Sequence, residues 1–292
     1  MAKPKIEYLP YGETTRFDLT NGVYEALAGK KNWAFAGFTL TDSEIPFHDG
    51  AVFEWIGAKT GTFTLPILIR GIDQADVYDR FSHLIKILNP LRGDGTLYYT
   101  HTDGVERYKT VRVVGGLDGS DRERDLGRDY MITDAKFFTV DPFWLQAVDT
   151  TTFVQEASEA TFFPFPPLTL TSSAVYSTTT ISNDGDADAL PVWTITGPGD
   201  LLVLRNLTTD KAFKLNHEIE IGEIVTIDAR IGAKTVKNAA GENMRQYIDE
   251  NNASLFPLVP GDNQIRVEIN LTTVNSEIKL DFTERYLRPY GT

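Results

Sequence analysis

Histidine is the residue type in this sequence best suited to bind a metal or act as a general base, because its side chain titrates near neutral pH. The chain has four histidines, His48, His83, His101 and His217. No two are four residues apart, the spacing that places two zinc ligands on one helix face. Cysteine is absent, which excludes thiolate metal sites, disulfides and a cysteine nucleophile. We therefore expect the histidines to be structural, with no metal and no cofactor bound.

Three alternating aspartates, Asp184, Asp186 and Asp188, are the second candidate for cation binding. A calcium-binding EF-hand loop also needs glycine at its sixth position and glutamate at its twelfth. Those positions are Ala189 and Ile195. We therefore expect a solvated turn here, with an irregular calcium site as the alternative.

Other catalytic motifs are incomplete. The glycine-rich stretch 115–119 lacks both the Lys-Ser/Thr ending of a phosphate loop and a G-x-G-x-x-G turn. No G-x-S-x-G elbow occurs. Carboxylates are numerous, but nothing singles out a glycosidase pair. Because no catalytic constellation is present, we expect a protein that is not an enzyme.

Tryptophan could provide flat platforms for sugars. The four tryptophans are Trp33, Trp55, Trp144 and Trp193. Packing in a core or an interface is the commoner role of this side chain. We expect that role here.

A charged segment at 118–129 follows the glycines, and its three arginines nearly balance its five acids. Such a segment is usually a solvated loop, since exposed ion pairs contribute little energy. The alternative is a contact loop whose charges set the register with a neighbouring subunit. The candidate contact residues are Asp121, Arg122, Glu123, Arg124, Asp125 and Arg128.

Composition sets the class of protein. The 292 residues are 41% hydrophobic and 24% charged, with a net charge of −13, which is typical of a globular chain of about two domains. The acidic balance argues against a surface that grips nucleic acid. The uncharged run 160–183 contains Pro164, Pro166 and Pro167, so we do not expect a membrane helix. No secretory signal pattern follows Met1.

One helix stands out, over 74–89. Asp73 is a plausible N-cap, and Pro90 ends the pattern. Its apolar residues follow one helical face; they are Val77, Phe81, Leu84, Ile85 and Leu88.

Short strands account for most of the remaining pattern. Residues 264–270 and 277–283 alternate apolar and polar side chains, which predicts antiparallel strands with one buried face. The other predicted strands are 65–70, 96–100, 108–114, 130–140, 192–196, 201–206, 217–221 and 224–228. The sequence thus predicts a mainly β chain with one prominent α-helix.

A domain boundary is expected near residue 148. The predicted strand 130–140 ends in Asp141, Pro142, Phe143 and Trp144, which we take as the candidate inter-domain junction. A Thr- and Pro-rich stretch follows. The predicted domains are 1–148, with the helix and several strands, and 149–292, which is all β.

The order of these signals resembles the distal tail proteins of long-tailed, non-contractile bacteriophages of the siphovirus type. The first domain contributes an extended pair leading to 65–71, which the helix follows directly, the pair 95–99 and 108–113, and the Phe137–Trp144 stretch ending in Asp-Pro-aromatic. The second domain contributes 183–185, 190–197, 221–228 and 258–263. The charged loop 118–129 has no match in the family pattern.

The resemblance implies a split-barrel-like first domain with its helix, followed by a jelly-roll or galectin-like β-sandwich. It implies a structural virion component, made in the host cytoplasm, that forms a ring, typically a hexamer, at the tail tip. The ring would join the tail-tube protein to the tail hub or baseplate protein and support receptor-binding or adhesin proteins for host attachment. DNA would pass through its lumen without specific binding, and no membrane insertion is implied.

Two other functions remain open from the sequence. A carbohydrate-binding module for cell-wall adhesion would place tryptophan or tyrosine on an exposed face. An enzyme such as a polysaccharide depolymerase would need two carboxyl groups about 5–10 Å apart in a cleft. The sequence also leaves open whether residues 286–292 pack on the first domain.

Overall fold

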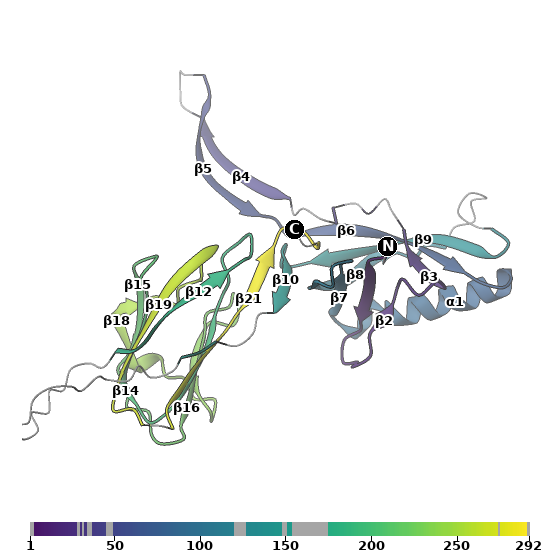
Figure 1. Cartoon of the computed structure of the whole chain (residues 1–292). Coiled ribbons are helices and arrows are strands. Elements are labelled where there is room, and N and C mark those ends of the chain that lie inside the picture. The colour runs from purple at the N-terminus through teal and green to yellow at the C-terminus, as the bar shows by residue number, and fades with distance from the viewer. Residues whose placement is uncertain are drawn as a thin grey trace, which may run out of the picture. The chain divides into compact units, whose positions relative to one another are not determined.

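The structure of the protein is a computed structural model. It describes residues 3–27, 30, 32–33, 37–44, 49–119, 127–147, 151–153, 175–273 and 275–290. The chain forms two compact units (Figure 1). Unit 1 is Met1–Gln146 together with Tyr286–Thr292, and unit 2 is Ala147–Arg285. The division therefore differs from the predicted one at its end, because the last residues belong to unit 1.

The described elements up to Ala147 are mostly strands. They are β1 (Lys5–Leu9), β2 (Phe17–Asp18), β3 (Tyr24–Ala26), β4 (Phe38–Glu44), β5 (Ala51–Ala58), β6 (Gly61–Arg70), α1 (Gln74–Ile87), a 3-10 turn (Pro90–Arg92), β7 (Gly95–Thr100), β8 (Glu106–Gly116), β9 (Tyr130–Thr139) and β10 (Trp144–Ala147). The main sheet has the order β2-β1-β7-β8-β9-β6-β3, and β10 pairs with β8. It is curled like half a barrel.

Helix α1 is capped by Asp73 at its N-terminus and by Leu88 at its C-terminus. The Asp73 carboxylate accepts a hydrogen bond of 2.9 Å from the Asp76 backbone N–H, which satisfies one of the free amides of the first turn. Val77, Leu84 and Leu88 are fully buried, as the apolar stripe predicts. Ile85 is instead 42% exposed, so the buried stripe is narrower than predicted.

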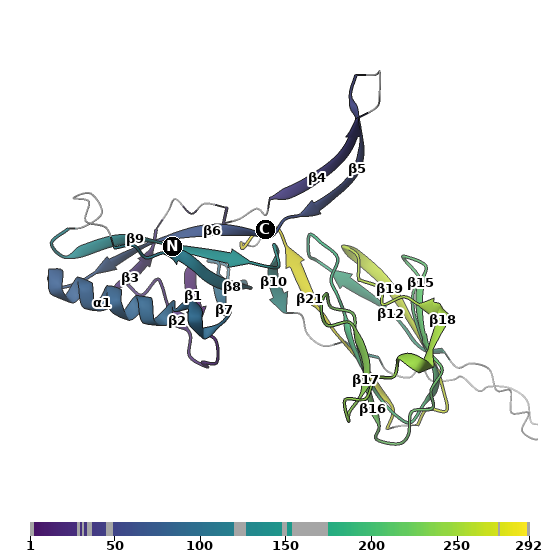
Figure 2. The same ribbon diagram turned by 180° about the vertical axis from the view of Figure 1, so that it is seen from behind.

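The core of unit 1 lies between α1 and the sheet. Leu84 and Leu88 belong to the same buried cluster as Ile67 and Ile69 of β6 and Phe137 of β9. The helix runs along the sheet in both views (Figures 1 and 2). Among the described residues, no helix has the length and apolarity needed to cross a membrane.

Unit 2 is a β-sandwich. Its described strands are β11 (Thr151–Phe153), β12 (Val175–Asn183), β13 (Val192–Thr196), β14 (Asp200–Asn206), β15 (Lys211–Leu215), β16 (Ile224–Asp228), β17 (Thr235–Asn238), β18 (Ile248–Ala253), β19 (Gly261–Asn270) and β20 (Glu277–Asp281), with a 3-10 turn at Arg245–Tyr247. The described strands form two sheets, ordered β11-β20-β13-β16-β17 and β12-β19-β14-β15-β18. Strand β21 (Thr283–Tyr286) follows.

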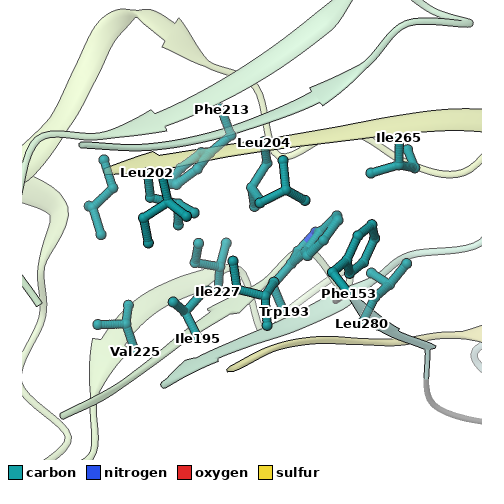
Figure 3. Packing of buried hydrophobic residues seen from close by; sticks show 14 of the residues in the cluster. Phe153, Trp193, Ile195, Leu202, Leu204, Phe213, Val225, Ile227, Ile265 and Leu280 are labelled. Atoms are coloured by element: carbon teal, nitrogen blue, oxygen red, sulfur yellow. The ribbon is translucent and has the colours of Figure 1, made fainter. Parts of the chain in front are cut away.

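The two sheets of unit 2 enclose an apolar core (Figure 3). Leu204, Phe213 and Ile265 come from one sheet and face Trp193 and Leu280 from the other. The alternation predicted for 264–270 and 277–283 is confirmed, because the apolar side chains of both stretches are at most 6% exposed. The predicted fold class is confirmed.

One predicted strand is wrong. Residues 217–221 alternate in the sequence, but only Ile219 forms a bridge, with Gly199. The segment is a connection between β15 and β16, and its exposed residues Ile221 and Gly222 form a turn. A short alternating stretch is a weak strand signal when no neighbouring strand is available for pairing.

Candidate functional site

The described histidines lie in separate local contacts. His83 Nδ1 is 3.4 Å from the Tyr24 hydroxyl, and His101 stacks on the ring of Tyr99. His217 Nε2 is 3.4 Å from a carboxylate oxygen of Glu223. No group of three or more His, Cys, Asp or Glu side chains that could hold a metal ion occurs in the described part of the chain. His48 lies outside it.

Three of the four tryptophans belong to cores. Trp144 is fully buried, Trp193 is 2% exposed and Trp33 is 9% exposed. Trp55, on β5, is 57% exposed. The expected packing is thus confirmed for the three tryptophans that lie in cores, and packing of Trp55 in an interface stays a prediction.

The three aspartates at 184–188 lie in the connection between β12 and β13. All three side chains are exposed. Asp184 accepts a hydrogen bond of 2.7 Å from the Ser182 hydroxyl, and the Asp186 N–H donates to the Arg285 carbonyl. The three carboxylates therefore lie on an exposed turn, which hydrogen bonds tie to residues 284 and 285.

The candidate junction Asp141, Pro142, Phe143 and Trp144 lies in unit 1, just before the chain passes to unit 2 at Ala147. The Asp141 carboxylate accepts from the Phe143 N–H at 3.0 Å, which closes a tight turn. The Trp144 indole N–H donates to the Trp33 carbonyl at 3.2 Å, and the two rings lie 5.1 Å apart. Trp144 thereby fixes the outgoing chain in the core of unit 1.

Lys109 of β8 holds the same turn from inside. It points inward and is 5% exposed. Its ammonium group donates to the Pro142 carbonyl at 2.8 Å and lies 5.0 Å from the centre of the Trp144 ring. Burial lowers the pKa of Lys109 to about 8, because desolvation disfavours the charged form, while the nearby Asp141 carboxylate acts in the opposite direction.

Arg107 is the neighbouring inward position on β8, and it holds the returning chain. Its guanidinium group donates to the carbonyls of Arg288 at 3.0 Å and Tyr290 at 2.8 Å. It also lies 3.3 Å from the centre of the Tyr286 ring. Residues 286–290 therefore pack in unit 1, which answers the question that the sequence left open.

The hairpin β4–β5 is a separate two-stranded sheet of unit 1 that extends beyond the main sheet (Figures 1 and 2). Leu40 pairs with Ile56, and these side chains are 57% and 51% exposed. Phe53 and Trp55 are each 57% exposed. The Trp55 ring covers Gly57, where any side chain would collide with it. The hairpin therefore displays apolar side chains along its length.

The charged loop is described only at its edges. Asp121, Arg122, Glu123, Arg124 and Asp125 lie outside the described residues. Arg128 is exposed, in a bend before β9. The role of this loop as a subunit contact stays a prediction.

One feature was missed from the sequence. Arg107 and Lys109 share the alternating face of Val111 and Val113, so two cations at inward positions of one strand were the available signal. The hairpin was anticipated only as an extended pair before 65–71, and the structure adds its bounds and its exposed apolar side chains.

Comparisons with known proteins found one matching family model and several solved structures with a similar fold. Residues 184–286 match the family model described as siphovirus-type tail component, C-terminal domain. The sequence-based resemblance to the distal tail protein family is thereby confirmed for the second unit. No curated protein matches the sequence.

Solved structures share the fold of the whole chain. The crystal structure of the Dit protein of phage SPP1, described as a paradigm of the hub adsorption apparatus in phages infecting Gram-positive hosts, is 13% identical, with a TM-score of 0.67; the likeness covers 97% of this chain and 99% of that one. The phage p2 baseplate in its activated conformation with Sr contains a chain that is 12% identical, with a TM-score of 0.53, over 97% of this chain and 98% of that one. At these identities the likeness establishes the fold.

Proposed function

We propose that this protein is a structural component of a phage tail tip. It forms a ring, a hexamer, that joins the tail tube to the tail hub or baseplate and serves as a platform for host-binding components. The match of residues 184–286 to a siphovirus-type tail component carries this proposal. The shared fold over nearly the whole chain supports it. The protein then resides in the virion and acts without catalysis.

The β4–β5 hairpin supports a role in subunit assembly. A two-stranded sheet is marginally stable by itself in water. Leu40 and Ile56 form an exposed apolar pair on it. A closed ring needs two different complementary patches on each subunit, and we assign one of them to this hairpin. We assign a second contact to the charged loop, with Asp121, Arg122, Glu123, Arg124, Asp125 and Arg128 setting the register.

The junction residues support a division of labour between the units. Lys109 and Arg107 bind backbone carbonyls on both chain segments that connect unit 1 to unit 2. We propose that Asp141, Pro142, Phe143 and Trp144 form the inter-domain junction, with unit 1 building the ring and unit 2 presenting partners.

The net charge of −13 supports passage of DNA without binding. Carboxylates that face a lumen repel phosphates and leave no cationic groove to retain them. Cryo-electron microscopy of the assembled tip tests this proposal about DNA passage. A lumen lined with lysine and arginine would contradict it.

The carbohydrate-binding alternative has less support. Trp193, the tryptophan of unit 2, is 2% exposed and packs in the core. A glycan platform of tryptophan is therefore absent from the described part of that unit.

Native mass spectrometry and negative-stain microscopy of the purified chain test the proposal. The wild type should form six-fold rings, alone or when mixed with its tail-tube and hub neighbours. The double variant Leu40→Ser/Ile56→Ser should lose them. The matched control is Ile231→Ser, a 74% exposed isoleucine of unit 2, which should keep them. A wild type that stays monomeric with both neighbours present overturns the proposal.

A further inference from the structure

Three loops meet at one end of the unit 2 sandwich. They are the β13–β14 turn (197–199), the β15–β16 connection (216–223) and the β19–β20 connection, described at 271–273 and 275–276. The register brings them together, because Thr196 pairs with Glu277 and Asp200 pairs with Asn270. An open pocket of about 530 Å³ lies among them, lined by Pro198, Gly199, Glu218, Ile219, Glu220, Ile221, Leu271 and Thr273. We call this surface the loop-end pocket.

Hydrogen bonds between the loops hold the pocket in shape. Gly199 and Ile219 exchange backbone hydrogen bonds of 3.0 and 2.7 Å. The Ser276 hydroxyl donates to the Pro198 carbonyl at 2.6 Å. The Gly197 N–H donates to the Glu223 carbonyl at 2.9 Å. A surface fixed in this way loses little conformational entropy when it binds a partner.

The wall of the pocket is apolar and open to solvent. Ile221 is 80% exposed and Leu271 is 69% exposed, beside the fully buried Ile219. Leu271 has a φ of 54°, in the left-handed region that leucine rarely adopts. Two such side chains at a preformed concavity can accept one apolar side chain of a partner.

The charges around the pocket have one sign. The segments 197–201, 216–224 and 270–277 carry five carboxylates and no lysine or arginine; the acids are Asp200, Glu218, Glu220, Glu223 and Glu277. Glu223 lies near His217, and Glu277 pairs with Lys279. Glu218 and Glu220 are exposed, and among the described residues neither carboxylate has an ion-pair partner.

We propose that the loop-end pocket docks a basic segment of a partner protein. One apolar side chain of that segment fills the space between Ile221 and Leu271, and lysines on either side of it pair with Glu218 and Glu220. Complementary charge selects this partner and speeds its encounter. The proposal rests on the proposed function, because it identifies where a host-binding component attaches to the platform.

Two other occupants fit the charges less well. Residues 154–174 of this chain contain two glutamates and no lysine or arginine, so they cannot satisfy the carboxylates. A second copy of the chain carries a net charge of −13, so it offers no excess of cations to pair with Glu218 and Glu220.

Fluorescence anisotropy with a labelled Lys-Leu-Lys-Phe-Lys peptide and the full chain tests the proposal. The peptide should bind the wild type more weakly as salt increases. The variant Ile221→Ser/Leu271→Ser should bind about tenfold more weakly, since it loses the apolar contact. The variant Glu218→Gln/Glu220→Gln should lose most of the salt dependence.

The matched control is Ile231→Ser, which alters an exposed isoleucine in the β16–β17 loop at the other end of the sandwich and should leave binding unchanged. Equal binding of a Glu-Leu-Glu-Phe-Glu peptide, or pocket variants that bind like the wild type, overturn the proposal. So does displacement of the peptide by an N-acetylglucosamine oligosaccharide, which identifies a glycan site. Ring formation, measured separately by native mass spectrometry, tests the proposed function without testing this pocket.

Discussion

Strands β8 and β19 alternate in the same way and have different interiors. The inward side chains of β19 include Ile265, Val267 and Ile269, all at most 2% exposed. The corresponding face of β8 begins with Arg107 and Lys109, each 5% exposed, before it becomes apolar. Alternation therefore determines which face of a strand is buried. Whether the buried side chains are apolar or cationic depends on the groups they contact, which for Arg107 and Lys109 are backbone carbonyls.

The two buried faces differ because different backbone segments pack against them. Both strands pair on two sides, β8 with β7 and β9 and β19 with β12 and β14, so strand pairing does not explain the difference. β8 lies beside the irregular segments around Pro142 and Arg288, whose carbonyls need donors. A buried carbonyl without a donor costs about 1–3 kcal/mol. Lysine and arginine supply several donors from one side chain, and this offsets part of the penalty for burying their charge.

Replacing Ile265 by alanine should have the largest effect on stability. The fully buried side chain belongs to the same apolar core as Leu204, Phe213 and Trp193. Its removal leaves a cavity and should lower the free energy of unfolding by about 3–4 kcal/mol. Urea unfolding of the purified chain measures this loss. The conservative change Ile265→Val should cost only about 1 kcal/mol, and an equal cost for both variants would contradict tight packing at this position.

The variant Lys109→Met tests the cationic interior of β8 through pH. Burial lowers the pKa of Lys109 to about 8 in the folded state, against about 10.4 when unfolded. Below pH 8 both states hold the proton, and the folded state carries the full desolvation penalty. Between about pH 8 and 10.4 only the unfolded state holds it, so the free energy of unfolding rises with pH, by up to about 3 kcal/mol.

Urea unfolding of wild type and variant from pH 7 to 10 isolates this rise. Other titrating groups, such as Tyr8 and Tyr24, whose pKa values are raised by burial, contribute equally to both proteins and cancel in the difference. The stability of the wild type relative to the variant should increase over this interval. A difference that does not change with pH would place the Lys109 ammonium in water.

The variant Arg107→Met tests the neighbouring position. It removes the donors to the Arg288 and Tyr290 carbonyls, but it also removes the penalty for burying a cation. The net loss of stability should be about 2 kcal/mol. Hydrogen exchange should increase within 286–290 and stay unchanged in β19. Faster exchange throughout unit 2 would instead indicate global destabilisation.

Periodicity predicted much of the fold because burial follows position in a regular element. The helix from Gln74 and the alternating stretch 264–270, which lies within β19, illustrate this. Alternation alone could not show that 217–221 is not a strand. This segment alternates, but only Ile219 forms a bridge, with Gly199. Periodicity also missed the role of Arg107. Its side chain binds the carbonyls of Arg288 and Tyr290, which are separated from it in the sequence by 181 and 183 positions.

The β4–β5 hairpin is a third case, a strand pair whose apolar side chains stay exposed. A substitution in it should have the smallest effect on the free energy of unfolding. Leu40 is 57% exposed, so Leu40→Ala removes little buried surface and should change the free energy of unfolding of the monomer by less than about 0.5 kcal/mol. The same substitution should weaken the assembled ring, because a subunit contact would bury this side chain. Urea unfolding at low protein concentration and native mass spectrometry at high concentration separate the two effects. A loss of monomer stability as large as that of Ile265→Ala would mean that the hairpin already packs within its own subunit, and the assembly role assigned to it would then be wrong.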